Sequence, residues 1–430
     1  MNASDIVTVT DPAHFTRAIT DMGEKCPVVT TQAIFNDRGI KIIEKGVTVN
    51  ASLYDRLMAH RLPTPLEQSV RTTPTVTGAL LRDHAEQAMA EVPFFQRMAA
   101  ETQTRSLLLD ALETLALPDP MAFQLSLAKE VRPALFRHSI HAALMAAWLT
   151  LDALVSRFDL GLAAAAGLLH DVGMLHLDPV LLQPHGAIAR EQRRQLYSHP
   201  LVSTMLIERH HEYPRELLRA VREHHEFLDG SGYPRHLSGP AIGPLARILC
   251  LSELVTSMLA LGGGLSEMRL WVKLRMNAHR YDPTLVARVE RHLQLGREHQ
   301  NDTRVLMANP VACLREINVV VADWPRDILQ SRNLSDNRRQ GMVAVVGQAE
   351  QLSRTLAGVG AAPEQLVQLG SEALDEALQL ELTLLAQEAQ WQLRTLARQT
   401  RRRWQSGAEP DYPDTLQAWL DRVDTLVAGA

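Results

Sequence analysis

Histidine and carboxylate side chains gather in the middle of this sequence, at spacings typical of metal sites. The pair His170-Asp171 ends an apolar stretch, Leu160–Leu169, and the pair His224-His225 precedes a Gly-rich segment. Imidazole nitrogen is a common ligand for transition metals, and a carboxylate neutralises charge and can bridge two ions. Neighbouring side chains diverge on a straight helix, but at a helix end a His-Asp pair can converge on one metal centre.

Three further positions extend this set of ligand-type side chains. His138 lies in a helical pattern before the His-Asp pair, His199 precedes Pro200, and Glu253 follows the pair Arg247-Ile248 in another helical pattern. A single His-Asp doublet would be weak evidence for a metal site. The ordered series of motifs predicts one much more specifically.

The order of these motifs resembles the HD-GYP family of metal-dependent phosphohydrolases, over residues of roughly 130–290. That family combines a His-Asp pair, a His-Pro pair and a His-His-Glu that leads into Asp-Gly-Ser-Gly-Tyr-Pro. The same motifs stand here as His170-Asp171, His199-Pro200 and residues 224–234. The resemblance implies an all-helical catalytic domain, a centre of two or three divalent ions (often iron or manganese) and hydrolysis of cyclic di-GMP.

Position by position, the resemblance implies seven metal ligands, among which Asp171 is the bridging carboxylate at the catalytic centre. They are His138, His170, Asp171, His199, His224, His225 and Glu253. The segment Asp229, Gly230, Gly232, Tyr233 and Pro234 is expected to form a tight loop, because glycine adopts positive φ at low cost and proline fixes the exit. The family analogy also allows this loop to contact a diguanylate cyclase.

The sequence departs from the family pattern in four places. Met174 replaces a lysine that is expected near the scissile phosphate, and Gly262–Gly264 replace an Arg-containing segment. Glu253 replaces an aspartate ligand, and Ala134 stands where members with a third metal carry a glutamate. The metal ligands are thus nearly complete while the phosphate contacts are reduced. A dinuclear centre is expected.

Three functions agree with this pattern. The first is a cyclic di-GMP phosphodiesterase. The second is a catalytically weak or inactive sensor or scaffold in cyclic-dinucleotide signalling, which Met174 and Gly262–Gly264 favour. The third is a phosphohydrolase that acts on a different phosphoester.

The hydrophobic pattern predicts a mainly α protein in three parts. Residues 1–75 read as a small β-rich module, with a hairpin turn at Asn36–Gly39, a short helix near residues 51–60 and a Pro-containing linker. Residues 76–296 carry helical periodicity and the metal motifs, and residues 297–430 read as a helical extension. The resemblance gives residues 1–75 a sensory or regulatory role.

The helical extension contains one especially long apolar stripe. Leu366–Arg403 is expected to form a single helix that starts near Pro363, because proline is tolerated in a first helical turn. A helical hairpin or bundle of this kind is a candidate element for homodimer formation.

Composition narrows the setting of the protein. The 430 residues carry a formal charge of −5, which gives no reason to expect a nucleic-acid partner. The three cysteines, Cys26, Cys250 and Cys313, stand far apart, so a disulfide framework is not expected. No uncharged run reaches the roughly 18 residues of a membrane span, and the N-terminus lacks a signal-peptide pattern. We expect a cytoplasmic protein in which other histidines, such as His141 and His176, are ordinary core or surface residues.

Overall fold

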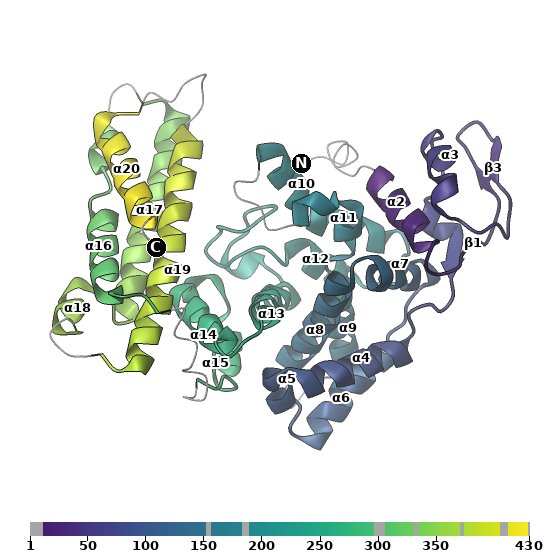
Figure 1. Ribbon diagram of the computed structural model, residues 1–430, viewed down its shortest axis with the longest axis horizontal. Helices are drawn as coiled ribbons and strands as arrows, with labels where there is room; N and C mark the ends of the chain where they lie inside the picture. Colours follow the sequence, from purple (N-terminus) through teal and green to yellow (C-terminus); the bar gives the residue numbers. More distant parts are fainter. Residues whose placement is uncertain are drawn as a thin grey trace. The chain divides into compact units, whose positions relative to one another are not determined.

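The chain is mainly α-helical, and its strands lie in the N-terminal part (Figure 1). The computed structural model describes residues 12–151, 156–182, 189–295, 306–330, 334–369, 374–404 and 412–428, and these statements concern those residues. The predicted fold class is confirmed. The chain groups into two compact units, the first Met1–Leu261 with His279–His292 and the second Gly262–Ala278 with Leu293–Ala430. The predicted division at residues 76 and 297 stays a prediction.

The first strand pair is the predicted hairpin. Strand β2 (Ile34–Phe35) pairs antiparallel with β3 (Lys41–Ile43). The side-chain oxygen of Asn36 accepts hydrogen bonds from the backbone N–H groups of Arg38 (3.0 Å) and Ile40 (2.8 Å), which closes the turn. Gly39 has φ 74°, a conformation that favours glycine.

The second strand pair corrects the expectation of a linker before residue 75. Strand β1 (Val28–Thr30) pairs antiparallel with β4 (Val70–Thr72), so Val28 lies opposite Thr72. Val28 and Val70 are both buried. Part of the predicted linker is therefore strand, stabilised by pairing across about forty residues of sequence.

Short helices complete the N-terminal part. They are α2 (Pro12–Met22), η1 (Ala51–Leu53), α3 (Tyr54–Met58) and η2 (Leu66–Gln68). The short helix expected near residues 51–60 is confirmed as η1 and α3, whereas α2 was not predicted. Phe15, Ile19 and Met22 of α2 are buried, and this helix packs on α7 (Asp119–Val131) and η3 (Val172–His176).

The rest of the first unit is helical. Its elements before and around the metal motifs are α4 (Gly78–Glu91), α5 (Pro93–Met98), α6 (Thr102–Glu113), α8 (Pro133–Thr150), α9 (Arg157–Leu169), η4 (Pro179–Leu182), α10 (Arg190–Leu196) and α11 (His199–Glu208). Those that follow are α12 (Arg215–Glu223), η5 (Gly239–Ala241), α13 (Pro244–Ala260), η6 (Ala278–Arg280) and α15 (Pro283–Glu290).

Helices α8 and α9 form the centre of this unit because small residues let them approach closely. Ala163, Ala164 and Ala166 of α9 are fully buried. A Cβ atom on Gly167 would lie 2.5 Å from the carbonyl oxygen of Ala142 on α8, so only glycine fits there. This close packing places the end of α9, and with it His170, beside α8.

By length and composition alone, the segment Arg157–His176 could also cross a membrane. However, 72% of its apolar window is buried inside the protein. The burial of these side chains in the helical core therefore explains why the segment is so apolar.

The second unit is a helical bundle with its own core. It contains α14 (Ser266–Met276), α16 (Pro310–Ala322), η9 (Arg326–Gln330), α17 (Asp336–Gly358), α18 (Pro363–Leu369), α19 (Glu376–Trp404) and α20 (Asp414–Ala428). The indole N–H of Trp419 on α20 donates to the carbonyl of Val320 on α16 (2.8 Å).

The prediction of one continuous helix over Leu366–Arg403 is wrong. Helix α18 does begin at Pro363, but it ends at Leu369, and α19 begins at Glu376. Asp375 caps the start of α19, because its carboxylate accepts a hydrogen bond from the N–H of Leu378 (2.7 Å).

Candidate metal centre

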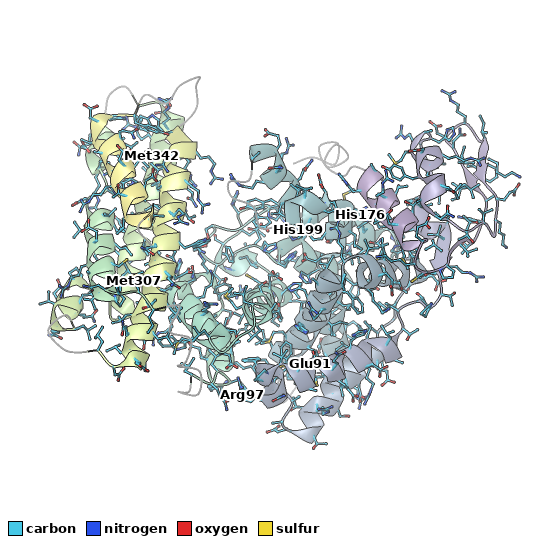
Figure 2. All side chains as sticks on the ribbon, viewed as in Figure 1. Glu91, Arg97, His176, His199, Met307 and Met342 are labelled. Carbon is cyan, nitrogen blue, oxygen red and sulfur yellow. The ribbon has the colours of Figure 1, made fainter. Side chains whose placement is uncertain are left out.

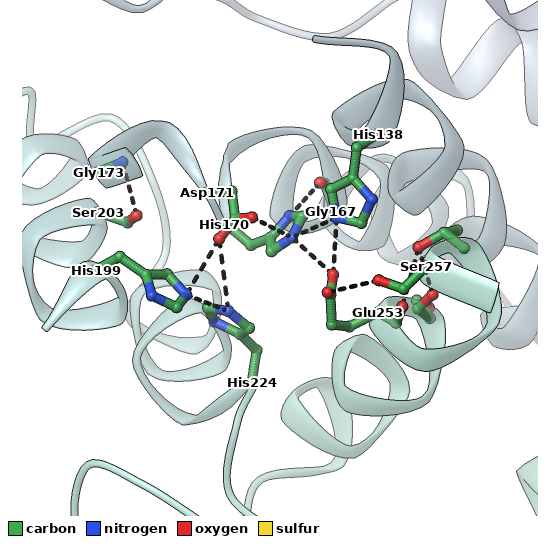
Figure 3. A network of polar contacts seen from close by, with 12 residues as sticks. His138, Gly167, His170, Asp171, Gly173, His199, Ser203, His224, Glu253 and Ser257 are labelled. Carbon is green, nitrogen blue, oxygen red and sulfur yellow. Dashed lines mark hydrogen bonds and ion pairs between the residues drawn. The ribbon is translucent and has the colours of Figure 1, made fainter. Parts of the chain in front are cut away.

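The seven predicted ligands fall into two groups of side chains, and each group converges on a point. Within a group, the ligand atoms all lie within 4.8 Å of one another. The four-residue group consists of His138, His170, Asp171 and Glu253, and the three-residue group consists of His199, His224 and His225. Most of these side chains, with their polar contacts, are drawn in Figure 3.

Separate helices supply these side chains, and several stand at helix ends. His138 and Glu253 lie within α8 and α13. His170 is the C-terminal cap of α9, His199 is the first residue of α11, and His224 caps the C-terminus of α12. The prediction that His170-Asp171 ends an apolar helix is confirmed.

The four-residue group is centred on Oε2 of Glu253. This oxygen lies 2.7 Å from Nε2 of His138 and 3.4 Å from Nε2 of His170 (Figure 3). The two imidazoles approach each other as well, with 3.3 Å between their Nε2 atoms. Glutamate in place of the family's aspartate therefore still reaches the other ligands.

Asp171 connects the two groups. Its Oδ2 atom lies 3.5 Å from Nε2 of His170, in the four-residue group. Its Oδ1 atom lies 3.2 Å from Nε2 of His199 and 3.8 Å from Nε2 of His224, in the three-residue group. Nε2 of His225 is in turn 3.1 Å from Nε2 of His199. One carboxylate thus faces two clusters of donors, as a bridging ligand must.

Backbone carbonyls orient three of the imidazoles. Nδ1 of His170 lies 2.7 Å from the carbonyl oxygen of Gly167, and Nδ1 of His199 lies 2.7 Å from that of Leu196. Nδ1 of His224 lies 2.6 Å from the carbonyl oxygen of Val221. A carbonyl only accepts, so Nδ1 carries the proton, and in a neutral imidazole the lone pair then sits on Nε2. This is the usual arrangement behind metal-binding histidines.

The chemistry of the site fits divalent metal ions. Oδ1 of Asp171 and Oε2 of Glu253 are both shielded from solvent and accept no well-oriented hydrogen bond. Buried carboxylate oxygens of this kind are costly unless a cation or donor compensates them. Imidazole and carboxylate donors together suit iron, manganese or zinc. Each of the two groups could hold one ion, with Asp171 shared between them.

Comparison with known proteins agrees with this geometry. The HD domain family matches the chain over residues 88–285. These residues form an HD domain. Within the HD domain lie His138, His170, Asp171, the three-residue group and Glu253.

Curated relatives of the HD domain are phosphodiesterases of Vibrio cholerae. The chain is 30% identical over 95 residues to 3'3'-cGAMP-specific phosphodiesterase 3, a match that covers 22% of this chain and 20% of the relative. It is 32% identical over 99 residues to the Cyclic di-GMP phosphodiesterase, covering 21% of this chain and 20% of the relative. The matched segments thus span about a fifth of these relatives' length.

Among solved structures, the chain is similar to Bd1817, a HDG"Y"P protein from Bdellovibrio bacteriovorus. The two chains are 14% identical, and the match covers 64% of this chain and 96% of the other, with a TM-score of 0.35.

The loop of the HD domain that follows the His-His pair is tightly built. Gly230 has φ 77°, as the expected tight turn requires. A Cβ atom on Gly232 would lie 2.4 Å from the carbonyl oxygen of His225, so the loop packs directly on the histidine pair. The carboxylate of Asp229 accepts hydrogen bonds from the N–H (2.9 Å) and hydroxyl (2.6 Å) of Ser231. Pro234 follows in a cis peptide bond with Tyr233.

Glu226 also holds this loop, a role that sequence reasoning missed. Its side chain is only 1% exposed. Its two oxygens accept hydrogen bonds from the backbone N–H groups of Arg235 (2.6 Å) and Leu237 (2.9 Å). The signal that could have revealed this role is the position of Glu226 next to His225 in the His-His-Glu motif.

Tyr197 is a second residue that sequence reasoning missed. Its ring lies parallel to that of Tyr233, with centroids 4.1 Å apart and planes 7° apart. Tyr233 stacks in turn on His225, with centroids 4.7 Å apart and planes 22° apart. The only signal in the sequence is that Tyr197 stands two residues before His199.

Opposite charges stabilise one another within the four-residue group. Burial opposes the charge of His170, but the carboxylates of Asp171 and Glu253 outweigh it and raise the pKa of His170 to about 9. Burial likewise opposes the charge of Asp171, yet His170 and His199 hold the pKa of this carboxyl below its usual range. Metal binding at this group would therefore displace protons.

The three-residue group behaves differently. Burial, followed by the charge of His199, lowers the pKa of His225 to about 3. Burial and the neighbouring histidines, His225 first, hold the pKa of His224 well below its ordinary value. These two imidazoles are therefore neutral near pH 7, and the neutral form is the one that ligates metals.

Two of the departures from the family pattern can be placed in the structure. Met174 lies in η3, and its backbone carbonyl accepts a hydrogen bond from the guanidinium of Arg132 (2.6 Å). Gly262 and Gly263 have φ angles of 64° and 76°, so these two positions favour glycine. The sequence change at Gly262–Gly264 thus comes with a backbone conformation that the arginine-containing segment would not readily adopt.

Proposed function

We propose that this chain is a metal-dependent phosphodiesterase that hydrolyses a cyclic dinucleotide at a dinuclear site. The observation that carries this proposal is the carboxylate of Asp171, whose two oxygens face the four-residue and the three-residue groups separately. The curated relatives support the substrate class, since their names specify 3'3'-cGAMP and cyclic di-GMP.

In this proposal each residue of the site has a separate role in metal binding or in shielding the site. His138, His170 and Glu253 would hold one ion, and the three-residue group would hold the other. Two divalent ions, which we propose to be iron or manganese, would supply Lewis acidity toward the phosphate and a water of lowered pKa. Asp171 would fix the shared position and balance the positive charge of both sites. The stacked ring of Tyr233 would shield His225 from solvent.

In the overall reaction, water adds its hydroxyl to phosphorus and its remaining proton to the departing ribose 3′ oxygen. A linear dinucleotide results, and a second hydrolysis would give two mononucleotides.

A second function is favoured by Met174 and Gly262–Gly264. A methionine offers no charge to a phosphate, and loss of one such contact costs about 3–4 kcal/mol of transition-state stabilisation. Under this alternative, the HD domain binds metal but turns over cyclic dinucleotides slowly or not at all, and acts as a sensor or scaffold. Altered phosphate contacts would also suit a different phosphoester.

The decisive experiment is turnover of cyclic di-GMP and 3'3'-cGAMP by protein purified without oxygen and loaded with Fe(II) or Mn(II). Hydrolysis that disappears in Asp171→Ala would support the phosphodiesterase. Absence of turnover, with about two metal ions bound per chain, would contradict it and favour the sensor or another substrate. A panel of other phosphoesters then separates these two.

The remaining proposals concern partners and setting. We propose that the loop from Asp229 to Pro234 contacts a partner such as a diguanylate cyclase, and that the second unit supports a homodimer. Size-exclusion chromatography with light scattering tests the dimer. A cytoplasmic location also stays a prediction.

A further inference from the structure

Three aromatic rings form a stack that leads away from the metal ligands. The ring of Tyr233 lies parallel to that of Tyr197, with ring centroids 4.1 Å apart. It lies nearly parallel to the ring of His225, with ring centroids 4.7 Å apart. Two rings do not fit on one face of a phenol at these separations, so His225 and Tyr197 occupy opposite faces of Tyr233. His225 is the inner ring, since its Nε2 lies 3.1 Å from Nε2 of His199.

Tyr197 is the outer ring, and it is open to solvent. It is 43% exposed, among the larger exposures of an apolar side chain in the described residues. One of its faces is covered by Tyr233. Among the described residues, Tyr233 is the only ring that stacks on Tyr197, and the opposite face extends the direction of the stack.

Helix geometry fixes this ring next to the metal ligands. Tyr197 is the C-terminal cap of α10, and its N–H bonds to the carbonyl oxygen of Arg193 (2.9 Å). Ser198 follows and is buried, and His199 then begins α11. His199, two residues after Tyr197, belongs to the three-residue group. Tyr197 therefore has little freedom to move away from the metal ligands.

The length of the stack sets how far a bound base would lie from the metal ligands. A planar base laid on the open face of Tyr197 would lie on the order of 13 Å from the His225 ring, since it would be the third ring layer outward. In a cyclic dinucleotide each phosphodiester joins two ribosides, so both bases lie one ribose away from a phosphate held at the metal ligands. One of these bases can extend toward Tyr197, whereas a phosphoester without a base leaves this ring uncovered.

From this arrangement we infer that Tyr197 is a base-stacking residue for one base of a cyclic dinucleotide whose phosphate lies at the metal centre. The inference rests on the proposed function and deepens it, because it names a residue that distinguishes nucleotide substrates from phosphoesters without a base. Every base has a π face, so stacking alone accepts cyclic di-GMP and 3'3'-cGAMP alike.

The test measures binding by isothermal titration calorimetry, with Mn(II)-loaded protein and slow turnover suppressed at low temperature. Tyr197→Ala should weaken binding of cyclic di-GMP roughly 5- to 100-fold, the range expected for loss of one base-aromatic stack. Tyr197→Phe and Tyr197→Trp should restore affinity, because each provides a planar ring. The affinity for inorganic phosphate, which has no base, should change less than about threefold.

Phe158→Ala is the matched control. Phe158 is also an exposed aromatic residue of the first unit, at 64% exposure. It lies near the start of α9, about 18 Å along the helix from His170. This variant should bind every probe as the wild type does.

The possible outcomes separate the two proposals. If wild-type protein binds cyclic di-GMP and Tyr197→Ala binds it equally well, base stacking at Tyr197 is overturned while the proposed function stands. If Tyr197→Ala weakens phosphate as much as the dinucleotide, Tyr197 acts on the metal site instead, and the inference is again overturned. If the wild type binds phosphate but neither dinucleotide, the proposed substrate class fails, and this inference fails with it.

Discussion

Oδ1 of Asp171 lies 3.2 Å from Nε2 of His199, while the other oxygen of the same carboxylate faces His170 at 3.5 Å. His170 caps α9 and Val172 begins η3. The carboxylate of Asp171 therefore lies where the chain changes direction. The turn is fixed by Gly173, whose N–H donates to the hydroxyl of Ser203 on α11 (2.9 Å) (Figure 3). The position of this carboxylate thus depends on contacts between helices that carry both groups of ligands.

The first prediction concerns this bridge. Asp171→Asn replaces an anionic ligand by a neutral amide, one end of which is a donor and cannot ligate a metal. Loss of even an outer partner of a metal ligand costs about 10- to 100-fold in metal affinity, and loss of a shared ligand should cost more at both sites. We expect bound metal to fall from about two ions per chain to less than one, measured by plasma mass spectrometry after desalting.

The control for this substitution is Asp83→Asn, which changes an exposed aspartate on α4. It should keep the metal content of the wild type. Retention of two ions by Asp171→Asn would show that Asp171 does not bridge them.

The second prediction separates the two metal sites. Oε2 of Glu253 lies 2.7 Å from His138, and Oε1 accepts a hydrogen bond from the hydroxyl of Ser257 (2.9 Å). Glu253→Gln should therefore remove the ion of the four-residue group and leave about one ion per chain. Ser257→Ala should keep both ions but weaken the first about 10- to 100-fold, because it removes the partner that orients Glu253. Competition with a fluorescent chelator measures both effects.

If Glu253→Gln lost both ions, the two groups would bind metal cooperatively through Asp171. If it lost none, Glu253 would not be a ligand, and its ion pair with His138 would be a purely structural contact.

The third prediction concerns Glu226, which holds the loop after the His-His pair. Its two oxygens accept the N–H groups of Arg235 and Leu237 in a buried position. Glu226→Gln turns one acceptor into a donor that faces a backbone N–H, which leaves buried polar groups unpaired. We expect a loss of about 1–3 kcal/mol in the free energy of unfolding, measured with urea. Glu216→Gln, an exposed site on α12, is the control and should change stability by less than about 0.5 kcal/mol.

Contact between residues close in sequence explains what sequence reasoning predicted well. The end of α9 at His170 was visible, because an apolar helical run stops at a polar pair. The turn at Asn36–Gly39 could also be predicted from local sequence, because its hydrogen bonds join residues only a few positions apart. The convergence of Glu253 with His138 came instead from the family resemblance, because no local rule brings α13 to α8.

Features that depend on distant partners were missed. Strand β4 has only three residues and is defined by its pairing with β1, so its periodicity is too short to detect. The stack of Tyr197 on Tyr233 joins residues that are 36 positions apart, and the sequence around Tyr197 does not predict it. The break before α19 was missed because the apolar stripe continues through Asp375, which acts as a cap there.

The fourth prediction concerns His176, which lies outside both groups of ligands and is labelled in Figure 2. Its ring stacks on that of Phe15 of α2, with ring centroids 3.9 Å apart. Its Nε2 is shielded from solvent without a hydrogen-bond partner. Burial, followed by the charges of Arg209 and Arg132, lowers the pKa of His176 to about 3 from an ordinary value of 6.5. The unfolded chain therefore binds a proton that the folded chain does not, and stability falls as the pH drops from about 6.5 toward 3.

His176→Phe keeps a ring against Phe15 and removes this proton uptake. Between pH 7.5 and pH 5, the wild type should lose about 1–2 kcal/mol more of its free energy of unfolding than this variant, because each pH unit within the window is worth up to about 1.4 kcal/mol. Urea unfolding at the two pH values measures the difference. His60→Phe, at an exposed position of the same unit, controls for the exchange of imidazole for phenyl. An equal loss of stability in His176→Phe and the wild type would show that His176 is protonated in the folded protein at pH 5, and that its stacking on Phe15 does not keep it neutral.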